Sequence, residues 1–332
     1  MGAIIGLLPV LAFLAALLLL DSYKLVRLRE VVALVAAGAA VAGVAYLANG
    51  ALLASSGLGF GTYTRYVAPP VEELLKALVI VALVRTHRVG FLVDAAIFGF
   101  GVGAGFAVVE NGVYVQQLRE ASAGLWVVRG FGTAIMHGGA TAIFAVAGLA
   151  MTERAREAAG WGAFMPGLAV AVVLHSAYNH LLPFPRASTL GILVVLPVVF
   201  YAVFRRSEEA VSGWLGHGFD ADTEMLDLIN SGRLSDSPVG RYLHALKDRF
   251  HGHVVADLLC YLRLYTELAL RAKGILLMRE SGFEVPVDEA TRAKFAEMRY
   301  LESSIGKTGL LAIQPMLHMS HKDLWQLYML GK

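Results

Sequence analysis

Seven long apolar stretches occupy the first 204 residues of this 332-residue chain and constrain its fold more than any other feature. They cover residues 3–20, 31–53, 67–84, 91–116, 130–150, 162–182 and 188–204. An α-helix needs about 20 mainly apolar residues to cross the hydrocarbon core of a bilayer. Hydrophobic residues make up 57% of the chain and charged residues only 16%. The sequence therefore predicts an all-α, polytopic membrane helix bundle of about seven spans.

Positive charges between these stretches predict the orientation of the bundle. Nine follow the first, third, fifth and seventh stretches: Lys24, Arg27, Arg29, Arg85, Arg88, Arg154, Arg156, Arg205 and Arg206. The opposite loops hold four: Arg65, Arg119, Arg129 and Arg186. Since cytoplasmic loops carry an excess of Lys and Arg, the N-terminus is expected outside. Everything after Arg205 is then expected in the cytoplasm.

The composition changes after residue 206, which predicts two domains. Residues 1–206 form the membrane bundle, and residues 207–332 form a soluble, all-helical cytoplasmic domain. The run 253–280 looks apolar, but charged residues interrupt it too often for a membrane span, so we expect a core helix there. The sequence of this domain contains no nucleotide-binding loop, metal motif or catalytic cluster. It is open to a cytoplasmic partner or to self-association.

Two features of the composition exclude whole classes of function. The net charge is only +2 and no run of Lys and Arg occurs, so nucleic acid is not an expected partner. The single cysteine, Cys260, excludes an intramolecular disulfide and a thiolate metal cluster. We expect it to be a buried apolar residue. Any metal ligands are then His and carboxylate side chains.

Three charged residues interrupt the third apolar stretch. Glu72, Glu73 and Lys76 follow the pair Pro69-Pro70. A charge at membrane depth costs at least about 2.5–3.5 kcal/mol, so such residues usually face the protein interior and carry function. An ordinary helix start also matches the pattern, with proline first, acids in the first turn and an i,i+4 pair of Glu72 with Lys76. The other stretches decide between these interpretations.

Three further stretches carry polar residues well inside them. The fourth contains Phe106 and Glu110, the fifth His137, and the sixth His175 and Asn179. Successive spans run in opposite directions, and each residue rises about 1.5 Å along a helix. All these groups, and the acidic pair of the third stretch, therefore fall in the outer third of the membrane. This shared depth predicts one polar cavity near the outer face.

The charge of this cavity favours a bound metal ion. Three carboxylates against one lysine leave two net negative charges in apolar surroundings. A divalent ion held by Glu110, His137 and His175 would neutralise them. Three ligands of this type with one open position are the usual plan of a catalytic zinc site, so zinc is a candidate cofactor.

Two mechanisms for activating water are compatible with these residues. With a metal, Glu72 or Glu73 acts as the general base and Asn179 helps to stabilise the oxyanion. Without a metal, Glu72 and a histidine activate the water directly. The spacing contains no HExxH helix, so the sequence leaves both open.

The same residues resemble the PrsW family of intramembrane proteases. The matching elements are Glu72-Glu73-x-x-Lys76, Phe106-x-x-x-Glu110, the isolated His137 and His175-x-x-x-Asn179. The resemblance covers about residues 60–185. Its relatives are the glutamate-type CAAX-prenyl proteases and the scaffold subunit of γ-secretase. One departure is Asn179, where PrsW proteins often carry Asp.

This resemblance implies an intramembrane endopeptidase in the inner (cell) membrane of a bacterium. It would cleave a membrane-anchored protein, such as an anti-sigma factor, near the outer face. By the same resemblance, Glu72, Glu73, Lys76, His175 and Asn179 are the expected catalytic residues.

Two other functions fit a polar cluster in a membrane bundle. One is a non-catalytic scaffold like the γ-secretase subunit, in which the cluster only holds helices together. The other is an ion or proton transporter, since carboxylates inside a membrane also mark ion pathways. Grouping at one depth argues against transport, because the one acid toward the inner side of these four spans is Asp94. It lies at a span end, where we expect it to be solvated.

Overall fold

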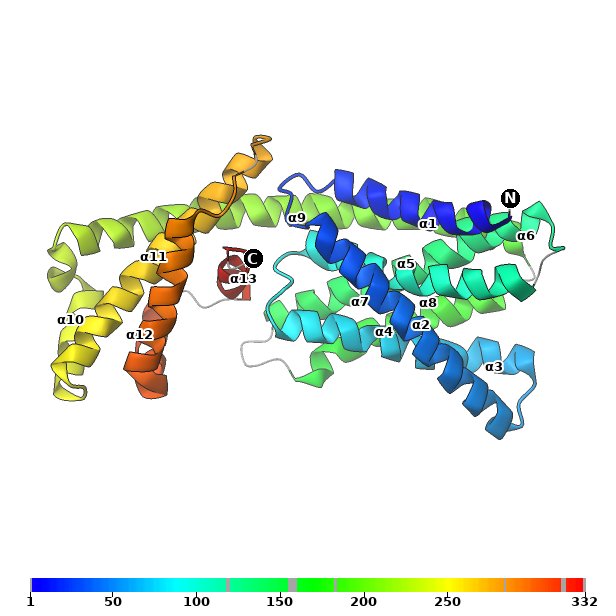
Figure 1. Cartoon of the computed structure of the whole chain (residues 1–332), viewed down its shortest axis with the longest axis horizontal. Coiled ribbons are helices and arrows are strands. Elements are labelled where there is room, and N and C mark those ends of the chain that lie inside the picture. The colour runs from blue at the N-terminus through cyan, green and yellow to red at the C-terminus, as the bar shows by residue number, and fades with distance from the viewer. Residues whose placement is uncertain are drawn as a thin grey trace. The chain divides into compact units, whose positions relative to one another are not determined.

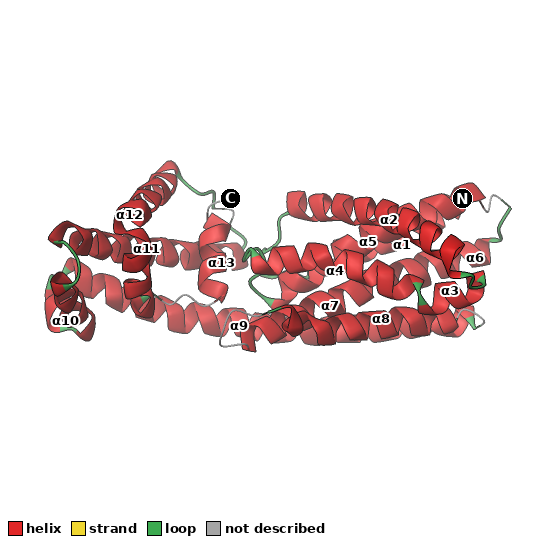
Figure 2. Ribbon diagram, turned by 90° about the horizontal axis from the view of Figure 1, so that it is seen from below, coloured by secondary structure: helices red, strands yellow, loops and turns green. Residues whose placement is uncertain are grey.

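The computed structural model describes residues 2–117, 120–154, 160–181, 184–283, 285–317 and 321–330. All regular structure within these ranges is helical and none of it is strand, which confirms the all-α prediction (Figure 2). Two of the loop charges counted above, Arg119 and Arg156, lie outside the described residues. The chain divides into two compact units, Met1–Glu208 and Glu209–Lys332.

The first unit is a bundle of helices, most of them long and apolar (Figure 1). They are α1 (Gly2–Leu19), α2 (Leu28–Ser56), α3 (Phe60–Tyr66), α4 (Ala68–Arg85), α5 (Leu92–Gln117), α6 (Ala123–Val127), α7 (Ile135–Arg154), α8 (Met165–His180) and the start of α9 (Pro185–Asn230). A π-helical segment, Val128–Ala134, joins α6 to α7. A 3-10 turn, Trp161–Phe164, leads into α8.

Among the described residues, five helical stretches are long and apolar enough to cross a membrane. They are Leu28–Ser56, Leu92–Gln117, Ala123–Arg154, Trp161–His180 and Pro185–Asn230. The protein is therefore a multi-pass membrane protein. The apolar part of α1, Ile4–Leu19, is shorter, and charged residues interrupt α4. Membrane crossing by these two helices, which would complete seven spans, stays a prediction.

Helix α5 is the buried centre of the first unit, and its glycines let two neighbouring helices approach it closely. It packs against α7 on one side and α2 on the other. A Cβ atom on Gly103 would overlap the carbonyl oxygen of His137, and one on Gly105 would overlap that of Val35. Small residues at such contacts are the usual way in which membrane helices pack closely. This packing places the start of α7, with His137, directly beside α5.

The acidic residues of α4 lie after its first turn and not within it. Pro69 and Pro70 occupy the opening positions, and the first turn contains no acidic residue. Glu72 and Glu73 therefore lie beyond the turn in which acids stabilise a helix N-terminus. The interpretation as a simple helix start does not describe this segment.

The expectation of a solvated Asp94 is wrong. Its side chain is buried, and its two carboxylate oxygens each accept a backbone hydrogen bond at 2.7 Å, from Gly90 and from Phe91. It thus satisfies N–H groups at the start of α5 that have no partner within the helix. This structural role accounts for an acid at this end of the bundle.

The second unit is also helical and has its own apolar core. Besides the last part of α9 it contains α10 (Pro238–Ala245), α11 (Gly252–Glu280), α12 (Glu289–Ile313) and α13 (His321–Leu330). Helix α11 packs against α12 and α13. The run predicted as a core helix, 253–280, falls within α11, whose residues Leu258, Leu262 and Tyr265 are buried. Cys260 is exposed, contrary to expectation, because it lies on the opposite face of this helix.

Candidate active site

Helix α4 carries a buried ion pair between Glu73 and Lys76. Lys76 Nζ lies 2.6 Å from Glu73 Oε1, and both side chains are almost completely buried. Residues three positions apart share a helix face. Lys76 therefore pairs with the second acid of the pair, whereas the spacing also allowed an i,i+4 pair with Glu72. A buried charge needs such a partner.

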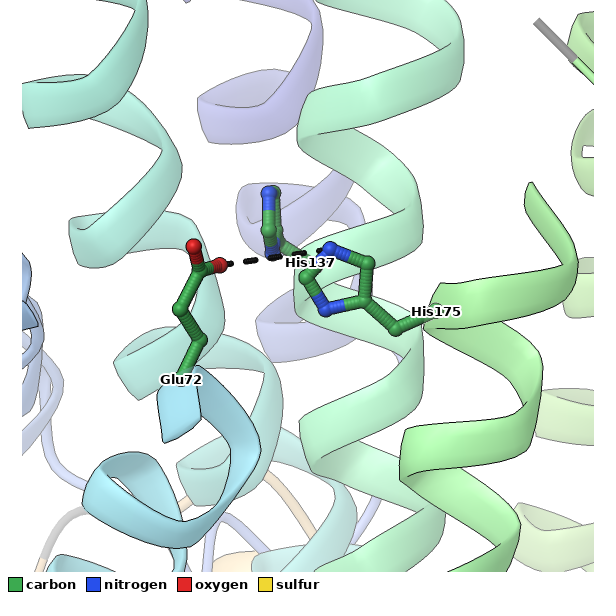
Figure 3. Close-up of side chains that lie close together, drawn as sticks. All are labelled: Glu72, His137 and His175. Carbon is green, nitrogen blue, oxygen red and sulfur yellow. Dashed lines mark ion pairs between the residues drawn. The ribbon is translucent and has the colours of Figure 1, made fainter. Parts of the chain in front are cut away.

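His175, from α8, contacts both acids of α4. Its Nδ1 lies 2.8 Å from Glu73 Oε1, and its Nε2 lies 3.9 Å from Glu72 Oε2. Figure 3 shows one oxygen of Glu72 facing this ring, with His137 close by. The first contact is a hydrogen bond, and the second is too long to be one. A gap of this kind between two polar atoms fits one bridging water molecule.

His137, at the start of α7, is held on both ring nitrogens. Its Nδ1 lies 3.1 Å from Lys76 Nζ, and its Nε2 lies 3.0 Å from Glu110 Oε2 of α5. A lysine ammonium can only donate, so Nδ1 accepts from Lys76 and Nε2–H donates to Glu110. The ring also meets His175 edge-on, at 4.7 Å between ring centres. His137 thus joins residues of α4, α5 and α8.

Glu110 has a second, cationic partner in Arg129. The guanidinium Nη2 lies 3.3 Å from Glu110 Oε1, and Arg129 Nε donates to Asn111 Oδ1 at 2.8 Å. The guanidinium also lies over the Tyr114 ring, 3.5 Å from its centre. Arg129 belongs to the π-helical segment before α7, and such segments often occur at functional sites. A residue counted as a loop charge is therefore part of the cluster.

The cluster contains three carboxylates and two permanent cations. With neutral histidines its net charge is −1, because Arg129 adds a cation to Lys76. The sequence had indicated two net negative charges. Glu73 is buried, whereas the side chains of Glu72 and Glu110 are 15% and 29% exposed. These two acids are the ones that water and a substrate can reach.

Asn179 and Phe106 lie at the edge of this cluster. Asn179 Nδ2 donates to the carbonyl oxygen of Thr64 at 2.8 Å, which ties α8 to α3. The ring of Phe106 lies 4.5 Å from Lys76 Nζ, a cation–π contact that stabilises a buried ammonium. The expected cluster thus forms, with Asn179 bonded to the backbone beside it.

A comparison with family models finds a match over most of the first unit. The model described as "PrsW family intramembrane metalloprotease" matches residues 27–204, more than half of the chain. The chain belongs to the PrsW family of intramembrane metalloproteases. It is therefore a membrane protease, which confirms the predicted family and reaction class. No curated protein and no solved structure matches it.

A PrsW metalloprotease implies a metal, and the donor atoms in the cluster fit one. Within the described ranges, the side chains of Glu72, His137 and His175 offer ligand atoms that all lie within 4.8 Å of one another. In tetrahedral zinc sites, bonds of about 2.0–2.1 Å place neighbouring donors about 3.4 Å apart. The contact of 3.9 Å between His175 Nε2 and Glu72 Oε2 is near that value. His137 Nε2 donates to Glu110, so this nitrogen would have to release Glu110 and lose its proton before it could bind a metal.

The two candidate ligand sets differ in one carboxylate. The sequence assigned Glu110 with the two histidines, whereas the group in the structure contains Glu72. Glu110 lies next to this group through His137 and is paired with Arg129. In this PrsW chain, Glu73 accepts a hydrogen bond from His175 Nδ1, as carboxylates often do behind a metal-binding histidine. That contact leaves Nε2 free to bind.

Three polar residues of the cluster were not among the predicted site residues. Besides Arg129, Asn49 of α2 donates from Nδ2 to Glu72 Oε1 at 3.1 Å. The hydroxyl of Tyr63, in α3, donates to Asn49 Oδ1 at 2.9 Å. An asparagine within an apolar span is a signal that sequence reasoning can use. Nothing in the sequence indicates which partner Tyr63 contacts.

Proposed function

We propose that this protease cleaves a membrane-anchored protein by attack of a water molecule held between Glu72, His137 and His175. The observation that carries the proposal is the gathering of these donor atoms within 4.8 Å, from three different helices. One carboxylate and two imidazoles are a common ligand set of catalytic zinc sites. A zinc ion bound there would polarise the substrate carbonyl and lower the pKa of its bound water.

The chain's own residues divide the work between the two adjacent acids. Glu73 contacts Lys76 Nζ and His175 Nδ1, so it orients these two side chains. Glu72 faces the gap of 3.9 Å to His175 Nε2 and contacts the reacting water. Both oxygens of Glu110 are already paired, with Arg129 and with His137, so Glu72 is also the carboxylate placed to accept the proton of that water. Without a bound metal, Lys76 keeps His137 in the tautomer that donates to Glu110.

Our proposals for the topology and the substrate are based on the pattern of loop charges and on the depth of the site. We propose that the enzyme lies in a bacterial inner membrane with residues 207–332 in the cytoplasm, as the bias in loop charge favours. The site then lies toward the outer face. A membrane-anchored regulator such as an anti-sigma factor is the kind of substrate that meets it. Residues 207–332 would bind a cytoplasmic partner or a second copy.

The test uses the full chain, purified and reconstituted in lipid vesicles. Single-span peptides serve as substrates, mass spectrometry reads the cleavage position, and elemental analysis reads the metal content. We expect wild type to cleave and to carry close to one zinc per chain. Glu72→Gln and His175→Ala should each abolish cleavage. His180→Ala, one turn further along α8, is the matched control and should cleave normally.

Two results would contradict the proposal. Cleavage at the wild-type rate by folded Glu72→Gln and His175→Ala proteins would exclude this site. Wild-type zinc content in those variants would show that Glu72 and His175 are not metal ligands. If they keep that zinc content and lose cleavage, the result would support activation of water by Glu72 and His175 without a metal.

A further inference from the structure

We propose that Asn49 and Tyr63 are positioning residues that fix the orientation of the Glu72 carboxylate, an inference that rests on the proposed function. The two form a hydrogen-bonded chain, from the Tyr63 hydroxyl to Asn49 Oδ1 at 2.9 Å and from Asn49 Nδ2 to Glu72 Oε1 at 3.1 Å. Asn49 comes from α2 and Tyr63 from α3, so the site also includes residues of two helices that carry none of the candidate ligands Glu72, His137 and His175.

The chemistry of the three groups fixes the direction of this chain. A carboxylate only accepts hydrogen bonds, so the amide of Asn49 must turn its NH₂ group toward Glu72. Its oxygen then faces the Tyr63 hydroxyl, which donates to it. The reverse orientation would set two acceptor oxygens against each other and leave one of them unpaired. Tyr63 is 2% exposed, so its hydroxyl has little access to water as another partner.

This chain determines which oxygen of Glu72 faces the reaction centre. Asn49 holds Oε1, and Oε2 is the atom that lies 3.9 Å from His175 Nε2. This hydrogen bond to one oxygen restricts rotation of the carboxylate about the bond that joins it to Cγ. A bound water molecule or metal ion would thus meet Oε2 in one fixed orientation. Residues that hold a metal ligand or a catalytic group in place in this way raise metal affinity and the rate of reaction.

Helix α8 secures α3 for this task. Asn179 Nδ2 donates to Thr64 O at 2.8 Å, and Ser176 Oγ donates to Arg65 O at 2.5 Å. Both carbonyls lie in the last turn of α3, where no intrahelical donor is left for them. The same helix therefore presents His175 to one oxygen of Glu72 and holds the helix whose Tyr63 acts on the other. Asn179 has an indirect role here, through the position of Tyr63.

The test measures zinc affinity and cleavage kinetics on the full-length protein. Asn49→Asp keeps the shape but removes the donor to Glu72, and Tyr63→Phe removes only the hydroxyl. Tyr66→Phe is the matched control, since Tyr66 lies on the exposed face of the same helix. Zinc binding is titrated with zinc alone against a chromophoric chelator. Single-span peptides in vesicles give kcat and KM, and thermal unfolding confirms that each variant is folded.

We expect Asn49→Asp and Tyr63→Phe to raise the zinc Kd by about 10- to 100-fold and to lower kcat with little change in KM. Tyr66→Phe should match wild type. Folded Asn49 and Tyr63 variants with wild-type Kd and kcat would overturn the inference, provided that Glu72→Gln loses both. If Glu72→Gln keeps both, the proposed function itself fails and this inference fails with it. If wild type binds no zinc, kcat alone decides.

Discussion

Replacing Lys76 by methionine should destabilise the membrane unit strongly, although methionine is the better residue in lipid. Lys76 is 0% exposed and contacts Glu73 Oε1, His137 Nδ1 and the Phe106 ring. Methionine fills a similar volume but offers no charge and no donor. The change therefore leaves the carboxylate of Glu73 buried without its ion-pair partner.

The size of the effect follows from the ion pair. At the observed N–O distance of 2.6 Å, Coulomb attraction is about 6 kcal/mol with an effective dielectric constant of about 20. Desolvation offsets much of this in the folded protein. Removing one partner of a buried pair nevertheless costs about 3–5 kcal/mol, because the remaining charge has no compensation. We expect that loss for Lys76→Met, and a smaller one for Glu73→Gln combined with Lys76→Met.

The second unit provides a control with the same geometry and different burial. Lys294 Nζ also lies 2.6 Å from a carboxylate, that of Glu267, but the lysine side chain is 43% exposed. Such solvated pairs contribute about 0–1 kcal/mol. Hydrogen–deuterium exchange read by mass spectrometry follows peptides of α4 and of α11 separately. It gives the free energy of opening for Lys76→Met and for Lys294→Met.

The reasoning fails if Lys76→Met lowers the opening free energy of α4 by less than about 1 kcal/mol, a value typical of an exposed pair. It also fails if the loss of opening free energy in the Glu73→Gln/Lys76→Met double variant equals the sum of the losses in the two single variants. Additivity of that kind means that the two side chains do not interact.

Three further predictions address packing, pH and the metal. Gly105→Leu should prevent close approach of α2 and α5 and give aggregated protein in size-exclusion chromatography, whereas Gly112→Leu, which has open space around it, should stay monodisperse. Burial tends to raise the pKa of Glu267, but hydrogen bonds from Lys294 and Arg263 outweigh this and lower it. The stability advantage of wild type over Glu267→Gln is therefore expected above the ordinary pKa of 4.5 and should be lost as the pH falls below it, as measured by exchange in α11. Glu73→Gln weakens the hydrogen-bond acceptor of His175 Nδ1 and should raise the zinc Kd about 10- to 100-fold in chelator competition. An unchanged Kd would show that Glu73 does not support metal binding by His175.

Much of the fold follows from local physical rules that a sequence displays. Apolar length indicates membrane helices, and five of the expected stretches meet that criterion in the described residues. The gathering of Glu72, Glu110, His137 and His175 followed from their shared depth and from the resemblance to one family. Depth along a helix is set by a constant rise per residue, so it can be estimated without knowing the packing.

Rotation of each helix about its axis was harder to predict, because it depends on what packs against it. Asn49 of α2 reaches Glu72, and Tyr63 of α3 reaches Asn49. Glycine contacts with α5 set the approach of α2, and hydrogen bonds from α8 hold α3. Arg129 was counted as a loop charge, since the π-helical segment that turns it toward Glu110 leaves no periodic pattern. The exact carboxylate in the metal-ligand group depends on the same rotations.

The two adjacent acids of α4 differ because consecutive residues on a helix point about 100° apart. Lys76 lies three residues after Glu73 and on the same face, so it neutralises Glu73 within the protein. Glu72 instead accepts a hydrogen bond from Asn49 of α2. In the proposed mechanism the first acid keeps Oε2 for the reaction, while the second accepts hydrogen bonds from Lys76 and His175. Moving the lysine one position earlier would keep the spacing of three residues but would turn it about 100° away from the buried face that Lys76 occupies. Leu75→Lys with Lys76→Leu should therefore restore neither cleavage nor the opening free energy of α4 to a Glu73→Gln protein.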